Sequence, residues 1–113
     1  MGAYAGVDLG ATHIRAVIGD AEGAVVASHK RDTPRGPTGI DVTEAVLDAL
    51  RGACEAADIS PSEIVAAGIG SFGPLDLAGG AVENPANLPD SIDRIPLTGP
   101  VKNLFDTDRV YLH

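Results

Sequence analysis

The chain is 113 residues long, which allows one domain and excludes a large two-domain enzyme within this length. Hydrophobic residues make up 44% and charged residues 21%, a composition typical of a globular protein and not of a disordered or disulfide-stapled one. The formal net charge of −8 argues against nucleic acid as a partner, because a nucleic-acid-binding surface is basic.

The acidic excess is the strongest compositional signal. Asp and Glu together number 16, against 8 for Lys and Arg. High ionic strength screens the self-repulsion of such a chain, so we hypothesise a halophilic source. Thermal melts in dilute buffer and in molar KCl, followed by circular dichroism, test this hypothesis, and equal stability in both would contradict it.

The first residues and the cysteine content indicate a cytoplasmic protein. The start, MGAYAGVDLG, has neither a basic region nor a long apolar run, so we expect no signal peptide and no membrane partner. Cys54 is the single cysteine, which excludes an internal disulfide. Its place in an apolar helical pattern predicts a buried packing thiol.

The first part of the chain predicts an antiparallel meander. Apolar alternation gives three short strands, at residues 3–8, 13–19 and 24–30. They are joined by the segment DLGAT at 8–12 and by a polar hairpin connection at 20–23. A plain hairpin favours Asn-Gly or Asp-Gly, so DLGAT is not explained as a hairpin turn alone.

The middle of the chain predicts one long helix and one buried strand. After a Pro/Gly loop at 33–39, an apolar stripe with helical spacing runs through residues 40–58. Residues 60–63, SPSE, are typical of a capped helical turn, because Ser caps and Pro suits the first helical position. The strand follows at 64–71.

The last part of the chain contains a long loop, from 71 to 99, that is rich in Gly, Pro and Asn and has a small hairpin across 78–80. A short helix at 97–105 and a strand at 110–112 complete an α/β fold with a mixed sheet of five strands. The aromatic residues expected in the core are Tyr4 and Phe105. Three aspartates in the loop are assigned no chemistry, because Asp is common in turns for backbone reasons: Asp76, Asp90 and Asp93.

DLGAT resembles the Asp-x-Gly-x-Thr phosphate motif in the amino-terminal domain of the sugar kinase, Hsp70 and actin superfamily. Two further segments, GIGSFGPLD at 68–76 and ENPANLPDSIDRIPL at 83–97, resemble the ROK family of bacterial and archaeal sugar kinases and sugar-sensing regulators. That family carries a Pro-Gly-Pro turn and an Asn-Leu-Pro loop there. The resemblance implies a ribonuclease-H-like (actin-like ATPase) fold for residues 1–113, serving as an amino-terminal nucleotide- and sugar-binding domain.

The resemblance also implies that these residues are the first part of a longer kinase. The family's second lobe carries a Glu-x-Gly-His sugar motif and a cysteine-rich zinc site, and neither motif occurs in this sequence. The family's catalytic aspartate belongs to an Asn-Asp pair directly after the strand that VYLH resembles. We therefore expect no catalytic residue within the chain, a general base just after His113, and no activity from this part alone. The full-length protein is expected to be a homo-oligomer.

Residues 8–12 are the expected site of ATP and Mg²⁺. Small side chains at Gly10 and Ala11 let backbone N–H groups approach a phosphate, and Thr12 adds a hydroxyl donor. Asp8, at the carboxyl end of the first strand, would hold Mg²⁺ through its water shell. The alternative for Asp8 is a carboxylate that only satisfies the amides of the turn.

His13 and Arg15 lie beside this turn and are included in the expected nucleotide site. Arg15 could reach a phosphate from its strand, although a solvated strand face is the alternative for both residues. His13 stands where the family often has Lys, so a direct charged phosphate contact is not implied there. Ala11 stands where the family often has a second Gly. This substitution of Ala for Gly stiffens the turn.

Sugar contacts are implied by the later motifs. In the family the backbone of the turn at Gly73 borders the sugar, and here Phe72 replaces the family's Pro. Asn87 matches the Asn of the Asn-Leu-Pro loop, and its amide can both donate to and accept from sugar hydroxyls. The alternative is an asparagine that shapes the loop, which is the interpretation preferred for Asn84. Ser71 either touches the sugar or only ends its strand.

The main interpretation is an ATP-dependent sugar kinase that transfers the γ-phosphoryl group to a hexose hydroxyl, with glucose implied by the family resemblance. One alternative is a sugar-responsive transcriptional regulator. Met1 is followed almost at once by the first strand, which leaves no space for a helix-turn-helix, and the acidic charge also argues against DNA. The other alternative is an ATPase of the Hsp70 or actin type, against which the Asn-Leu-Pro loop argues.

Overall fold

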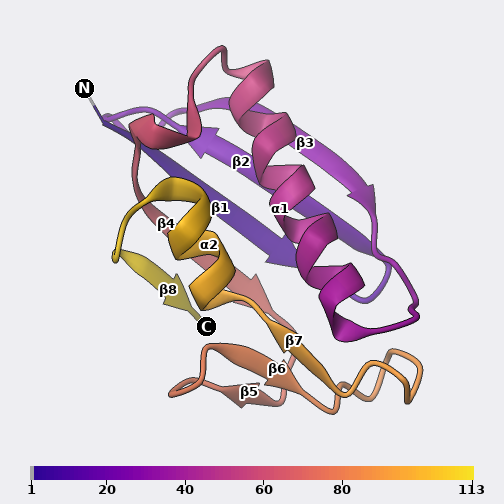
Figure 1. Cartoon of the computed structure of the whole chain (residues 1–113). Helices are drawn as coiled ribbons and strands as arrows, with labels where there is room; N and C mark the ends of the chain where they lie inside the picture. Colours follow the sequence, from indigo (N-terminus) through magenta and orange to yellow (C-terminus); the bar gives the residue numbers. More distant parts are fainter. Residues whose placement is uncertain (1) are drawn as a thin grey trace.

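The structure, a computed structural model, describes residues 2–113 and is built around a five-stranded sheet (Figure 1). Its strands are β1 (Ala3–Leu9), β2 (His13–Gly19), β3 (Val25–Asp32), β4 (Ile64–Ser71) and β8 (Val110–Leu112). The strand order is β3-β2-β1-β4-β8. The first three strands form an antiparallel meander, whereas β4 is parallel to both β1 and β8. The mixed sheet of five strands that the sequence predicts is confirmed.

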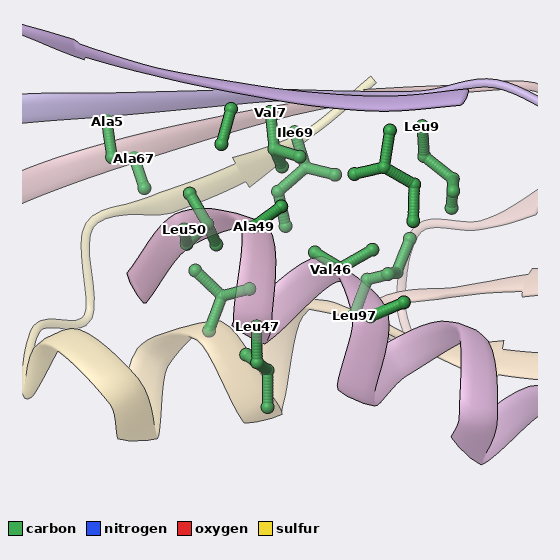
Figure 2. Close-up of a cluster of buried hydrophobic side chains, with 14 of the residues drawn as sticks. Ala5, Val7, Leu9, Val46, Leu47, Ala49, Leu50, Ala67, Ile69 and Leu97 are labelled. Atoms are coloured by element: carbon green, nitrogen blue, oxygen red, sulfur yellow. The ribbon is translucent and has the colours of Figure 1, made fainter. Parts of the chain in front are cut away.

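Two helices cover one face of this sheet, α1 (Gly39–Ala56) and α2 (Thr98–Phe105) (Figures 1 and 2). The backbone N–H of Thr38 donates to the Asp41 carboxylate at 2.9 Å, which satisfies a donor at the start of α1. A 3-10 turn at Pro61–Glu63 confirms the predicted capped turn, since the N–H of Ser60 donates to the Glu63 carboxylate at 2.7 Å. No helix within residues 2–113 is both long enough and apolar enough to cross a membrane.

The hydrophobic core lies between the sheet and the two helices (Figure 2). Strand alternation sends Ala5, Val7 and Leu9 of β1 toward the helices, where they meet α1 residues such as Val46 and Leu50. All five side chains are buried. Since full burial of a large aliphatic side chain contributes roughly 1.5 to 3 kcal/mol, this interface fixes which face of the sheet is internal.

Tyr4 and Phe105 were both predicted to lie in the core, and the prediction for Tyr4 is wrong. Tyr4 is 45% exposed, because it alternates with Ala5 and therefore lies on the face opposite the helices. Phe105 is 1% exposed and belongs to the core as predicted. Cys54 is also 1% exposed, which confirms the buried packing thiol, and burial raises the pKa of this thiol with a smaller contribution from Glu63.

A second, smaller antiparallel sheet follows β4 and lies beyond its carboxyl end (Figure 1). Its strands are β5 (Leu75–Asp76), β6 (Ala81–Glu83) and β7 (Arg94–Pro96). The predicted hairpin across 78–80 is confirmed, but the sequence did not predict the third strand. The small sheet is pinned by Arg94, whose Nη1 donates to Asp76 at 3.2 Å and to Glu83 at 2.6 Å.

Several element boundaries differ from the predictions by one or two residues. The third strand runs to Asp32 instead of residue 30, because Asp32 pairs with His13 at the start of β2. The long helix begins at Gly39 and ends at Ala56, within two residues of the predicted 40–58. These shifts place the end of β3 directly beside the turn between β1 and β2.

Candidate functional site

The turn between β1 and β2, residues 10–12, is a tight backbone loop. The N–H of Gly10 donates to the carbonyl of His13 at 2.9 Å. A Cβ on residue 10 would lie 3.0 Å from that same oxygen, which explains the glycine. Among residues 2–113, the N–H groups of Ala11 and Thr12 have no hydrogen-bond acceptor. Two unused neighbouring amides are the kind of donors that bind a phosphate.

Thr33, directly after β3, holds this turn from the other side. Its N–H donates to the carbonyl of Thr12 at 2.9 Å, and its hydroxyl donates to the carbonyl of Gly10 at 2.7 Å. The residue is only 6% exposed. Thr33 was not among the site residues predicted from the sequence. The register of an antiparallel meander could have indicated it, because the residue that follows the third strand lies beside the residue that precedes the second strand.

Asp8 lies near the end of β1 on the sheet face opposite the helices. It is exposed and stands opposite Arg15 of β2 and Gly70 of β4. With His113 these residues line a hollow of about 340 Å³, whose other lining residues are Gly6, Val7, Val17 and Gly68. The structure therefore brings Asp8 and Arg15 to one place. A glycine-lined hollow lets a ligand approach the backbone closely.

The surroundings of Asp8 bear on its two interpretations. Within residues 2–113, its carboxylate accepts no hydrogen bond from the turn amides, so the geometry gives no support to a purely turn-satisfying role. No group of three or more His, Cys, Asp or Glu residues in the described part of the chain is arranged to hold a metal ion. A single exposed carboxylate fits Mg²⁺ that keeps most of its water ligands.

His13 is exposed at the start of β2 and faces the end of β3. Its Nδ1 atom lies 3.4 Å from the Asp32 carboxylate. The imidazole of His13 therefore contacts a neighbouring carboxylate at the edge of the turn. The structure therefore places Arg15, and not His13, beside Asp8 in the hollow.

The end of β4 lies beside the same turn, because Ser71 is in register with Leu9 of β1. The Ser71 hydroxyl donates to the carbonyl of Phe72 at 2.9 Å, and its N–H donates to the carbonyl of His113 at 3.0 Å. The first contact is local, and the second joins the end of β4 to the residue that follows β8. Gly73 is exposed in the turn that leads to β5.

Asn87 lies in the loop 84–93, which connects β6 to β7, and it is exposed. The loop is anchored by two buried neighbours, Leu88 at 5% and Ile92 at 1% exposure. Its ends are joined where the N–H of Asn84 donates to the carbonyl of Asp93 at 2.7 Å. Asn84 has φ of 47°, a left-handed conformation that Asn tolerates, so it has the loop-shaping geometry that was preferred for it.

The turn 10–12 and the loop 84–93 are connected through the segment 33–39 (Figure 1). Thr33 at its start holds the turn. A Cβ on Gly36 would lie 3.7 Å from the Ser91 hydroxyl of the loop, and Gly39 packs against the carbonyl of Arg94 with no space for a Cβ. The two candidate ligand-binding segments are therefore joined by one short stretch of chain.

The aspartates of the long loop do not form a carboxylate cluster with one another. Asp76 accepts a hydrogen bond from the N–H of Gly79 at 2.9 Å and contacts Arg94. These two interactions, the backbone one first, hold the pKa of Asp76 below its usual value of 3.8. Asp76 therefore has structural partners in Gly79 and Arg94.

The strand order β3-β2-β1-β4-β8, with a phosphate-type turn after β1, defines an actin-like ATPase fold. The chain belongs to the ROK family, whose model matches residues 4–112. It is 44% identical over 73 residues to a glucokinase from Streptomyces coelicolor, a match that covers 65% of this chain and 21% of that protein.

Among the solved structures that the chain resembles, two ROK kinases match 90% or more of it. A ROK hexokinase from Thermus thermophilus superposes with a TM-score of 0.78 at 29% identity, over 98% of this chain and 34% of that one. A ROK family glucokinase from Streptomyces griseus, solved with glucose and AMPPNP, gives a TM-score of 0.68 at 32% identity, over 90% of this chain and 30% of that one. The chain thus spans about a third of the length of these relatives.

Proposed function

We propose that the protein is an ATP-dependent sugar kinase of the glucokinase type, and that residues 1–113 form its nucleotide- and sugar-binding amino-terminal domain. The observation that carries this proposal is the turn 10–12, whose amides at Ala11 and Thr12 lack acceptors within residues 2–113 and which begins two residues after the exposed Asp8. A family relative solved with glucose and AMPPNP supports both ligands.

The nucleotide end of the site uses backbone and side-chain donors together. The amides of Ala11 and Thr12 and the Thr12 hydroxyl would bind the phosphate oxygens of ATP, because fixed donors stabilise the charge that develops there. Asp8 would orient Mg²⁺ through water, and the bound ion would neutralise phosphate charge. Arg15 lines the same hollow as Asp8 and would add a cation at its edge.

The sugar end of the site uses Asn87, with the backbone at Gly73 and the end of β4 at Ser71 as the neighbouring surface. Asn87 is exposed on an anchored loop, which leaves its amide available to donate to one sugar hydroxyl and accept from another. The general base that removes the hydroxyl proton is proposed to be an aspartate that follows His113 in the longer protein.

A coupled assay of ADP release from the full-length protein, run over a panel of sugars with Mg-ATP, tests the proposal. We expect glucose-dependent ADP release, and none from residues 1–113 alone. ATP hydrolysis that is independent of every sugar would instead indicate an ATPase, and specific DNA binding without phosphoryl transfer would indicate a regulator.

A homo-oligomeric, cytoplasmic full-length protein is part of the same proposal. Light scattering coupled to size-exclusion chromatography measures its mass in solution. A monomer at all working concentrations would contradict the oligomeric part without affecting the kinase assignment.

A further inference from the structure

Thr33 is a buried polar residue that our proposed roles for the site do not use. It belongs to none of the three segments that resemble the family, and it lies 21 positions along the chain from Thr12, one of its two partners. Its hydroxyl and its N–H both donate to carbonyl groups of the turn 10–12. The turn therefore owes two of its contacts to a single residue, which directly follows β3.

These contacts determine which polar groups the turn leaves for a ligand. The carbonyl oxygens of Gly10 and Thr12 carry partial negative charge and would repel a phosphate. Thr33 engages both oxygens, at 2.7 Å and 2.9 Å. The amides of Ala11 and Thr12 remain as backbone donors of the turn that have no acceptor within residues 2–113. Because Thr33 is only 6% exposed, its hydrogen bonds are also shielded from competing water.

We infer that Thr33 is a positioning residue for nucleotide binding: its hydroxyl holds the carbonyl of Gly10 and so fixes the turn 10–12 with the amides of Ala11 and Thr12 available to a phosphate. This inference rests on the proposed kinase function. Thr33 itself touches no ligand and acts through the backbone of Gly10. Removal of the hydroxyl should therefore weaken binding of the nucleotide and leave binding of the sugar unchanged.

The chain offers a matched control for this inference in Thr43. Thr43 is 4% exposed, and its hydroxyl donates to the carbonyl of Pro96 at 2.6 Å and to that of Gly39 at 3.3 Å, within the α1 and β7 contact. Thr33→Val and Thr43→Val are nearly isosteric changes that each remove one buried hydroxyl bonded to backbone. Only the first of these hydroxyls contacts the turn.

The experiment measures the Kd of Mg-AMPPNP by calorimetry, and the KM values of ATP and glucose, for the full-length protein and its variants. Loss of one buried hydrogen bond at the turn should raise the Kd and the KM of ATP about fivefold in Thr33→Val. The KM of glucose should not change, Thr43→Val should leave both nucleotide constants near the wild-type values, and Thr33→Ser, which keeps the hydroxyl, should restore them.

Equal effects of the two valine variants on the Kd, or no effect of Thr33→Val, would overturn the positioning role. A wild-type protein that binds no Mg-AMPPNP would instead overturn the proposed function. If Thr33→Val does not fold, the pair Thr33→Ser and Thr33→Ala, which differ only by the hydroxyl, gives the same comparison. Equal Kd values for that pair would then contradict the inference.

Discussion

The turn 10–12 and the loop 84–93 are both candidate ligand-binding segments, but they are held in different ways. The turn is fixed along its length by three hydrogen bonds, one from Gly10 and two from Thr33. The loop is held at its base by the Arg94 ion pairs and by the hydrogen bond from Asn84 to Asp93, and farther along by the burial of Leu88 and Ile92. Asn87 stands between these anchors and is itself exposed.

This difference matches the chemistry that each segment is proposed to serve. A phosphate group is the same in every ATP molecule, so rigid backbone donors suffice to bind it. Sugars differ in the orientation of their hydroxyls, and a side chain on a loop is the part of a fold that changes most freely between relatives. The comparison predicts that changes in the turn region alter nucleotide chemistry, whereas changes in the loop region alter sugar affinity.

The largest expected effect is that of Asp8→Ala on the full-length protein. Loss of the proposed Mg²⁺-orienting carboxylate removes stabilisation of phosphate charge in the transition state, so kcat should fall at least about a hundredfold. The KM of the sugar should stay near its wild-type value, because Asp8 lies on the nucleotide side of the comparison. Steady-state kinetics measure both constants, and unchanged turnover would refute the metal role.

A structural change in the segment that joins the two regions should act mainly on the loop. In Gly39→Ala the new Cβ would clash with the backbone carbonyl of Arg94, which is at the end of the loop. We expect a loss of roughly 1 to 3 kcal/mol in the free energy of unfolding, measured by urea denaturation, together with a raised KM for the sugar.

Gly99→Ala is the control for this variant. Gly99 lies in the first turn of α2, and a Cβ there would have no neighbour within 4 Å. The control should keep the wild-type stability. If the two variants behave alike, the contact between α1 and β7 does not support the loop.

Asn87→Ala tests the sugar side of the comparison directly. Loss of hydrogen bonds to sugar hydroxyls should raise the KM of the sugar about tenfold and leave the KM of ATP unchanged. Asn103→Ala, at an exposed position on α2, is the matched control and should change neither constant. An unchanged sugar KM in Asn87→Ala would remove Asn87 from the site.

The smallest expected effect concerns the base of the loop and depends on pH. The pKa of Asp76 is lowered in the folded state by the Gly79 amide and by Arg94, so the ionised carboxylate stabilises the fold. This contribution is fully present above the usual value of 3.8 and is lost as the pH falls through the lowered pKa.

Urea denaturation at several pH values should therefore show Asp76→Asn less stable than the wild type near neutral pH, with the difference shrinking in strong acid. Asp90→Asn, at an exposed position of the same loop, is the control. A stability difference that does not depend on pH would contradict the assigned role of the Asp76 charge.

Much of the fold could be predicted because its signals are local. Alternating apolar residues gave β1, β2 and β4, and helical spacing gave α1, each within about two residues of the observed bounds. The strand β7 was missed because three residues ending in Pro96 carry too short a pattern, and its pairing with β6 depends on a partner that is distant in the sequence.

The part of the candidate site that could be predicted also has local signals in the sequence. DLGAT is a local motif, and its glycine has a local cause in the carbonyl of His13. Thr33 has no local signal, because its role arises only when the end of β3 is brought beside the turn. Likewise, no motif indicates that Gly39 contacts Arg94 and so connects the two regions.

The sequence by itself determined most of the order of the elements, the motif DLGAT with its acid, and the resemblance to one family. Only the tertiary structure decided which face of the sheet is covered, and therefore that Ala5 is buried while Tyr4 is exposed. The physical reason is that alternation in a strand defines two faces equally well. The packing of α1 and α2 then selects one of them as the core and leaves Asp8 on the other.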